Sequence, residues 1–154
     1  MDIRINNRQK RFKIHRKPIK ELCVAVLSGE DQPDHCELDI TIVSDAEIAE
    51  LNKQYLSHDG PTDVISFPQD DEPSDEIYLL GDVVVSADRA HERSADFAVN
   101  LNQEFGLYLI HGILHLLGFD DQTEQDKIIM ENRQSFWFNK LLSKSDFMFL
   151  SLNL

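Results

Sequence analysis

Four stretches of the chain alternate apolar and polar side chains or form short apolar runs, which is the pattern of strands that bury one or both faces. The acidic segment Gln69 to Glu76, between the third and fourth stretches, is predicted to be an exposed mobile loop, and residues 58–61 a turn. The predicted strands are Asp2 to Asn7, Cys36 to Val43, Asp63 to Phe67 and Leu80 to Ser86.

Apolar residues that recur every three or four positions, together with capping residues, predict five helices. Ser44 and Glu47 form a capping box, and Ser86 with Asp88 starts a later helix. Residues beyond Lys144 have no caps or clear period and are expected to be frayed. The predicted helices are Pro18 to Leu27, Ser44 to Leu56, Ala90 to Phe97, Asn100 to Leu117 and Glu124 to Leu142.

These elements predict an α+β fold, with residues 1–154 as a single domain. Strands that alternate with helices indicate a small mixed four-stranded sheet, on which the long helix Asn100 to Leu117 packs. The side chains expected to face inward from the second and last helices are Ile48, Leu51 and Tyr55, and Ile128, Met130, Phe136, Trp137 and Leu141.

Composition indicates an intracellular protein that folds without disulfides. A chain of 154 residues can bury about two thirds of its unfolded surface. Cys23 and Cys36 are too far apart for a zinc knuckle or redox pair, and are predicted to be buried in a reducing compartment. No apolar run matches a signal peptide or the roughly 18 residues of a membrane span. We expect a cytoplasmic protein without membrane association, of undetermined oligomeric state.

The charge is unevenly distributed along the chain. Residues 1–20 carry eight of the fifteen Lys and Arg and a single acid, a net charge of +7, whereas the whole chain has a net charge of -13. A basic segment on an acidic body can hold phosphates along a defined track. The alternative is an edge strand whose Lys and Arg side chains prevent pairing with other chains. Charge alone favours neither interpretation.

Two histidines four residues apart, His111 and His115, fall within the long predicted helix, which places both imidazoles on one face. Gly118 is suited to end this helix in a left-handed conformation, after which the chain can return with Asp120 or Asp121. Two imidazoles and a carboxylate are a common ligand set for catalytic zinc, which lowers the pKa of its water to about 7. The spacing therefore predicts a metal-dependent hydrolase.

The same spacing occurs in the long zincin signature, with two differences. Gly112 replaces the glutamate that serves those peptidases as general base, and Asp121 replaces their third histidine. A peptidase mechanism is therefore disfavoured. The alternative is that both histidines are polar members of a buried helix, but the glycine and the acid that follow them favour a metal site.

Three further strings precede this motif: Leu51-Asn52-x-x-Tyr55, Thr62-Asp63-Val64-Ile65-Ser66-Phe67-Pro68 and Leu80-Gly81-Asp82-Val83-Val84-Val85-Ser86. With the histidine motif, over about residues 36 to 140, they resemble the bacterial YbeY-type endoribonucleases, which are rRNA maturation factors. The resemblance implies a zincin-like fold and one zinc ion per chain. It also implies single-strand-specific RNA cleavage in 16S rRNA 3′ end maturation and ribosome quality control, with rRNA and the ribosomal subunit as partners.

The family motif places metal ligands at His111 and His115, and at Asp121, where the family has a histidine. Asp120 falls on the family's aspartate and is expected to orient one of the metal ligands without binding the metal itself. Whether Asp121 or Asp120 completes the site stays open, as does the general base. The residues expected to bind substrate are Thr62, Asp63, Ser66 and His58.

Leu56 departs from the family pattern, which has an arginine at this position. Leucine cannot stabilise the charge that develops on a phosphate, so we expect a slow nuclease unless another cation substitutes. His58 and the basic N-terminal segment are candidates, although His58 also fits a simple turn residue.

Two other functions compete with a nuclease. One is a ribosome-assembly factor that binds RNA or protein and has a structural or weakly active zinc site, which Leu56 and the acidic surface favour. The other is a metallohydrolase of a non-RNA substrate, which Gly112 weakens. An open coordination position would indicate an enzyme, and four protein ligands a structural site.

Overall fold

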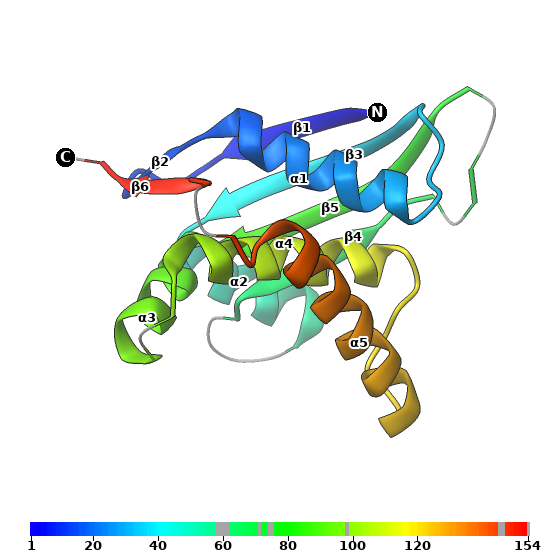
Figure 1. The fold of residues 1–154 in the computed structure, drawn as a ribbon. Helices are drawn as coiled ribbons and strands as arrows, with labels where there is room; N and C mark the ends of the chain where they lie inside the picture. Colours follow the sequence, from blue (N-terminus) through cyan, green and yellow to red (C-terminus); the bar gives the residue numbers. More distant parts are fainter. Residues whose placement is uncertain (58–61, 71, 74–75, 98, 145–146, 154) are drawn as a thin grey trace.

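A mixed four-stranded sheet, in the order β1-β3-β5-β4, forms the centre of the molecule (Figure 1). The computed structural model describes residues 1–57, 62–70, 72–73, 76–97, 99–144 and 147–153. β1 (Asp2–Asn7), β3 (Cys36–Val43) and β5 (Tyr78–Ser86) are parallel, and β4 (Val64–Pro68) is antiparallel to β5. The four predicted strands and the predicted fold class are confirmed.

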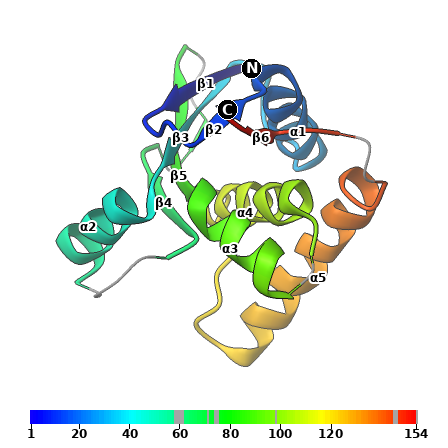
Figure 2. The ribbon, with the colours of Figure 1, turned by 90° about the vertical axis from the view of Figure 1, so that its left-hand side faces the viewer.

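Five helices occur in the described part of the chain: α1 (Arg16–Gly29), α2 (Asp45–Leu56), α3 (Ala87–Phe97), α4 (Leu101–Leu116) and α5 (Glu124–Leu141). Figure 2 shows α2 on one side of the sheet and α1, α4 and α5 on the other. The Ser44 side chain accepts a hydrogen bond from the Glu47 N–H at 3.3 Å, which confirms the predicted cap. Across the described residues, no helix has the length and apolar character needed to span a membrane.

Side-chain alternation along the strands divides the core between the two faces of the sheet. Leu38 and Ile42 of β3 are buried in the large cluster that α1 and α4 complete. Val43, which points to the opposite face, packs with Ile48 of α2. Both cysteines are buried and free, as predicted.

Some side chains predicted to face inward are exposed instead. Tyr55 is 59% exposed near the end of α2, and Ile128 and Phe136 are exposed on α5. The reason is that α5 buries a narrow stripe, which includes Met130 and Trp137, so residues beside the stripe face solvent. Leu51 and Leu141 are half-buried at the core's edge.

A second, two-stranded sheet joins the two ends of the chain and was not predicted. β2 (Phe12–Ile14) pairs antiparallel with β6 (Leu150–Leu152). The Asn102 side-chain oxygen accepts hydrogen bonds from the backbone N–H groups of Phe149 (2.7 Å) and Leu150 (2.9 Å). The expectation of a frayed end beyond Lys144 is therefore wrong for residues 147–152. Three-residue strands are too short to show a period, and their pairing spans nearly the whole sequence.

Candidate functional site

Helix α4 places His111 and His115 side by side, as the spacing predicted. Their ring centroids lie 4.5 Å apart, with an angle of 77° between the ring planes, and both side chains are half-buried. They line a pocket of about 350 Å³, the histidine pocket, whose other walls come from α2 and β4. These walls are Leu56, Val64, Ile65, Ser66 and Pro68.

Gly112 allows α4 to lie directly on the sheet. A Cβ atom at this position would lie 2.5 Å from Cγ1 of Val83 and 3.0 Å from Cγ2 of Val64. The Ser66 hydroxyl donates a hydrogen bond to the Gly112 carbonyl at 2.8 Å. Gly112 therefore has a packing role, which holds the segment with the two histidines against β4.

The helix ends just before Gly118, which reverses the chain as predicted. Gly118 has a φ of +100°, its N–H donates to the His115 carbonyl at 3.1 Å, and the Phe119 N–H donates to the Leu114 carbonyl at 3.0 Å. This pair of bonds is the Schellman motif, in which a left-handed glycine reverses the chain. The reversal places Asp121 close enough to His115 for its carboxylate to affect the pKa of the imidazole.

His111 has a partner that orients its ring. The His111 Nδ1 contacts Oε1 of Gln134 on α5, and this contact orients the ring with Nε2 on its other side. The backbone of Phe119 lies close enough to His115 to act on its pKa, which it raises. Sequence reasoning missed Gln134; the available signal was a polar residue on the inward stripe of α5, between Met130 and Trp137.

Burial lowers the pKa of His115, and the neighbouring His111 lowers it further. The carboxylates of Asp121 and Asp120 act in the opposite direction without cancelling these effects. His115 is therefore held in its neutral form, which is the form that binds a metal ion.

Two of the three predicted zinc ligands fit this role. Neutral imidazoles with hydrogen-bonded partners behind them are the usual nitrogen donors for zinc. Within the described residues, however, no group of three His, Cys, Asp or Glu side chains is arranged to hold one ion. Asp121 is exposed, and one oxygen of the Asp120 carboxylate accepts a hydrogen bond from the Gln122 N–H at 3.3 Å. The third ligand stays a prediction.

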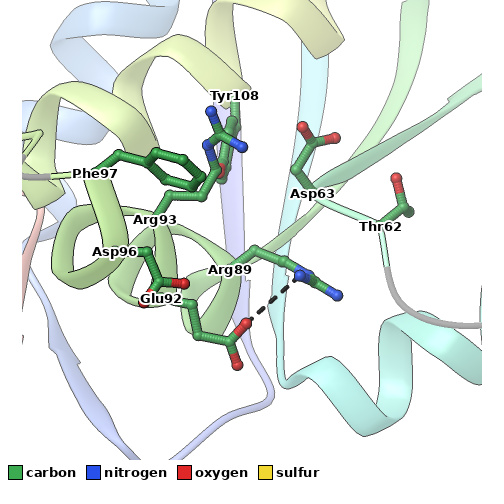
Figure 3. A pocket seen from close by; sticks show the side chains of 8 residues that line it. All are labelled: Thr62, Asp63, Arg89, Glu92, Arg93, Asp96, Phe97 and Tyr108. Atoms are coloured by element: carbon green, nitrogen blue, oxygen red, sulfur yellow. Dashed lines mark hydrogen bonds and ion pairs between the residues drawn. The ribbon is translucent and has the colours of Figure 1, made fainter.

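The residues predicted to bind substrate lie in two places. Ser66 is in the histidine pocket, where its hydroxyl bonds to Gly112. Thr62 and Asp63 line a different pocket (Figure 3), here named the Tyr108 pocket, together with side chains of α3 and α4. The predicted role of His58 lies outside the described residues.

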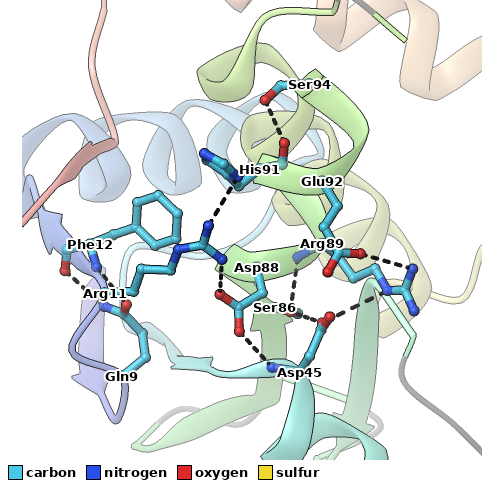
Figure 4. Close-up of polar contacts among 10 residues, drawn as sticks. All are labelled: Gln9, Arg11, Phe12, Asp45, Ser86, Asp88, Arg89, His91, Glu92 and Ser94. Carbon is cyan, nitrogen blue, oxygen red and sulfur yellow. Dashed lines mark hydrogen bonds and ion pairs between the residues drawn. The ribbon is translucent and has the colours of Figure 1, made fainter. Parts of the chain in front are cut away.

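Three of the four arginines of the basic N-terminal segment are paired with acids of the protein body. Figure 4 shows Arg11 in contact with Asp88, whose other oxygen accepts the Asp45 N–H at 2.9 Å. Because β1 is also an edge strand, this arrangement favours the interpretation of a protected edge over that of a phosphate track. The pairs are Arg4–Asp39 (2.6 Å), Arg8–Glu47 (2.6 Å) and Arg11–Asp88 (3.0 Å).

Comparisons with known proteins agree with this architecture. Proteins named endoribonuclease YbeY are similar to this chain: that of Syntrophotalea carbinolica is 38% identical over 143 residues, covering 90% of this chain and 95% of the relative. That of Bacillus subtilis is 36% identical over 126 residues, covering 77% and 80%. A Thermotoga maritima protein solved in solution has a TM-score of 0.63 and 27% identity, covering 90% of this chain and 88% of that one. The family profile described as Endoribonuclease YbeY matches residues 4–142, and the chain therefore belongs to the YbeY endoribonuclease family.

Proposed function

We propose that this protein is a zinc-dependent endoribonuclease that cleaves single-stranded rRNA, and that it acts in 16S rRNA 3′ end maturation and ribosome quality control. The observation that supports this most is the pair of oriented imidazoles on α4, which line a pocket bordered by β4 in a chain of the YbeY family. The pocket is open at the surface, so an extended strand of RNA has access to it.

His111, His115 and Asp121 are the residues we propose to hold the zinc ion. When bound, zinc supplies Lewis-acid chemistry, because it polarises a phosphate oxygen and lowers the pKa of water. Gln134 fixes the ring of His111, and Gly112 holds the helix against β4. Asp121 follows the turn at Gly118, and its carboxylate is close enough to His115 to raise the pKa of the imidazole.

The ligand set is tested by metal content after dialysis against graded chelator. We expect His111→Ala and His115→Ala to lose zinc at the lowest chelator concentrations, and Asp121→Ala to lose it more readily than Asp120→Ala. Full zinc retention by Asp121→Ala would show that Asp121 is not a ligand. Asp121→His should bind zinc more tightly than the wild type, because imidazole reaches further than a carboxylate.

The histidine pocket has little positive charge for an RNA phosphate. None of the described residues that line it is Lys or Arg, and Leu56 forms part of the wall. A positioned cation commonly contributes about a hundred- to a thousandfold in rate. We therefore propose that the protein is a slow nuclease.

Leu56→Arg tests this proposal directly, because residue 56 faces the same pocket as the two histidines. Metal-loaded wild type, Leu56→Arg and His115→Ala are compared on one single-stranded RNA, and Gln54→Arg adds the same charge at an exposed position outside the pocket. We expect faster cleavage only by Leu56→Arg and none by His115→Ala. Equal cleavage by all four proteins would indicate contamination and overturn the nuclease proposal.

A ribosome-assembly factor with a weakly active zinc site is the second candidate. The absence of a cation among the described residues of the histidine pocket and the pairing of the N-terminal arginines favour it. If neither the wild type nor Leu56→Arg cleaves RNA while both retain zinc, this second function replaces the first.

A further inference from the structure

The Tyr108 pocket has a volume of about 340 Å³ and lies where α3, α4 and the residues before β4 meet (Figure 3). Three acids and two arginines line it, so these side chains have a net charge of -1. A phosphate would meet a negative environment here. The charged residues are Asp63, Glu92, Asp96, Arg89 and Arg93.

The hydroxyl of Tyr108 has no hydrogen-bond partner among the described residues, although Tyr108 is only 5% exposed. The neighbouring Glu104 carboxylate is paired with Arg93 at 3.2 Å and also lies close enough to Tyr108 to raise its pKa. Burial raises the pKa of Tyr108 most; the attraction between its O–H and the Glu104 carboxylate and the negative charges of Glu104 and Asp63 raise it further, and Arg93 lowers it. The hydroxyl therefore lies among the charged groups of the pocket and can bond to a ligand.

Arg89 supplies a second unsatisfied donor in the same pocket. Its Nε is buried and makes no hydrogen bond within the described residues; an Asp45 oxygen lies 3.8 Å away, which is an ion-pair distance only. Its Nη1 contacts Glu92 at 3.4 Å (Figure 3). Buried polar side chains normally have partners, so two unsatisfied donors in one pocket indicate a ligand that presents acceptor atoms.

Phe97 and Arg93 add flat surfaces to one side of the pocket. Phe97 is 62% exposed, and the Arg93 guanidinium carbon lies 4.8 Å from the centre of its ring. Aromatic rings and guanidinium planes are the groups on which unpaired bases stack in proteins that bind single strands. The Arg93 side chain is half-exposed, so this part of the wall is open to a planar group from the solvent.

The Tyr108 pocket and the histidine pocket lie along the same helix and the same strand. Tyr108, His111 and His115 have the spacing of one helix face, and the first two are about 4.5 Å apart along the helix axis. On the strand side, Asp63 directly precedes β4 and Ser66 lies within it, about 10 Å further along. A single strand that occupies one pocket can therefore reach the other through a neighbouring nucleotide.

We propose that the Tyr108 pocket binds an unpaired base of the same RNA strand whose phosphate lies at the two histidines. This inference rests on the proposed nuclease function. Tyr108 and Arg89 donate to acceptor atoms on the edge of the base, Asp63 accepts from its N–H groups, and Arg93 with Phe97 forms the stacking surface. The base is neutral, which the net negative charge of the pocket tolerates better than a phosphate.

The test uses a single-stranded RNA pool randomised around one cleavage site, with products sequenced after treatment with metal-loaded protein. We expect the wild type to prefer certain bases at one fixed position beside the cleaved bond. Tyr108→Phe removes only the hydroxyl and should reduce this preference by about two- to tenfold at that position, the effect of one hydrogen bond. Tyr78→Phe, at another buried tyrosine on the far end of β5, should leave it unchanged.

Binding of the same pool to His115→Ala, with and without Tyr108→Phe, measures the preference without cleavage. This binding measurement tests the pocket even if the protein does not cleave RNA. Failure of the nuclease proposal would instead appear as the absence of His115-dependent cleavage. Tyr108→Phe should keep or raise the melting temperature, because the hydroxyl has no partner to lose. An unchanged base preference, an equal loss of affinity for all sequences, or a large fall in melting temperature would overturn the proposal.

Discussion

The two pockets along α4 differ in how their polar groups are satisfied. In the histidine pocket two polar side chains have fixed partners: His111 contacts Gln134, and Ser66 bonds to Gly112. In the Tyr108 pocket, the Tyr108 hydroxyl and the Arg89 Nε have no hydrogen-bond partners in the described part of the chain.

This difference indicates two kinds of binding. A metal ion requires donors that are already oriented, because its bonds are short and directional. A base can instead be recognised by donors that gain their hydrogen-bond partners only when the base binds. We therefore expect changes in the histidine pocket to act mainly on metal affinity and overall rate, and changes in the Tyr108 pocket to act on sequence preference.

The largest effect should come from removing the partner behind His111. Gln134→Ala should weaken zinc affinity by about ten- to a hundredfold, because loss of a group that orients a metal ligand typically has this cost. Competition with a chromogenic zinc chelator measures the change. Gln125→Ala, an exposed glutamine on the same helix, is the matched control. Equal affinities of the two variants would show that the ring of His111 needs no support.

Crowding the histidine pocket should cost stability as well as metal binding. Gly112→Ala places a methyl group 2.5 Å from Val83, and overpacking of this kind costs about 1–3 kcal/mol in the free energy of unfolding. Urea unfolding measures it. Gly118→Ala meets no atom within 4 Å but is strained at a φ of +100°, so it should destabilise without moving α4 away from β4. Normal zinc affinity in Gly112→Ala would show that close packing of α4 on β4 is not needed to position the two histidines.

A smaller effect should appear in the dependence of stability on pH. The pKa of His115 is lower in the folded protein than its ordinary value of 6.5, so the unfolded chain binds more protons between these two values. The free energy of unfolding should therefore decrease as the pH falls through 6.5. With chelator present, His115→Gln should reduce the slope in this range. An identical slope in both proteins would show that burial does not hold His115 neutral.

The smallest effect is expected at the N-terminal segment, outside both pockets. Replacing Arg4, Arg8 and Arg11 with glutamine should change the salt dependence of RNA binding little, because each arginine is already paired with an acid. Fluorescence anisotropy at several salt concentrations measures the slope. A clearly flatter slope would support the interpretation of a phosphate track, because a variant with fewer phosphate contacts releases fewer counterions on binding.

The sequence predicted the elements that depend on local periodicity and capping. The four sheet strands, the helix with both histidines, the Ser44 cap and the left-handed Gly118 are present as expected. Each depends on side chains within a few residues of one another. Tyr55, Ile128 and Phe136 were placed wrongly, because periodicity shows which face of a helix is apolar but not how much of that face the neighbours cover.

Only the tertiary structure decided the contacts between segments that are far apart in the chain. Gln134 contacts His111 from another helix, and β2 pairs with β6 from the opposite end of the sequence. Arg4, Arg8 and Arg11 form ion pairs with acids on β3, α2 and α3. The same applies to the separation of Thr62 and Asp63 from Ser66: the three share one short string, yet they line two pockets because α3 and α4 close around one end of β4. The sequence by itself determined which residues carry the chemistry, because side-chain type and local spacing are written in it. Their partners were decided by packing, because the free energy of a buried polar contact depends on which segment the fold brings beside it.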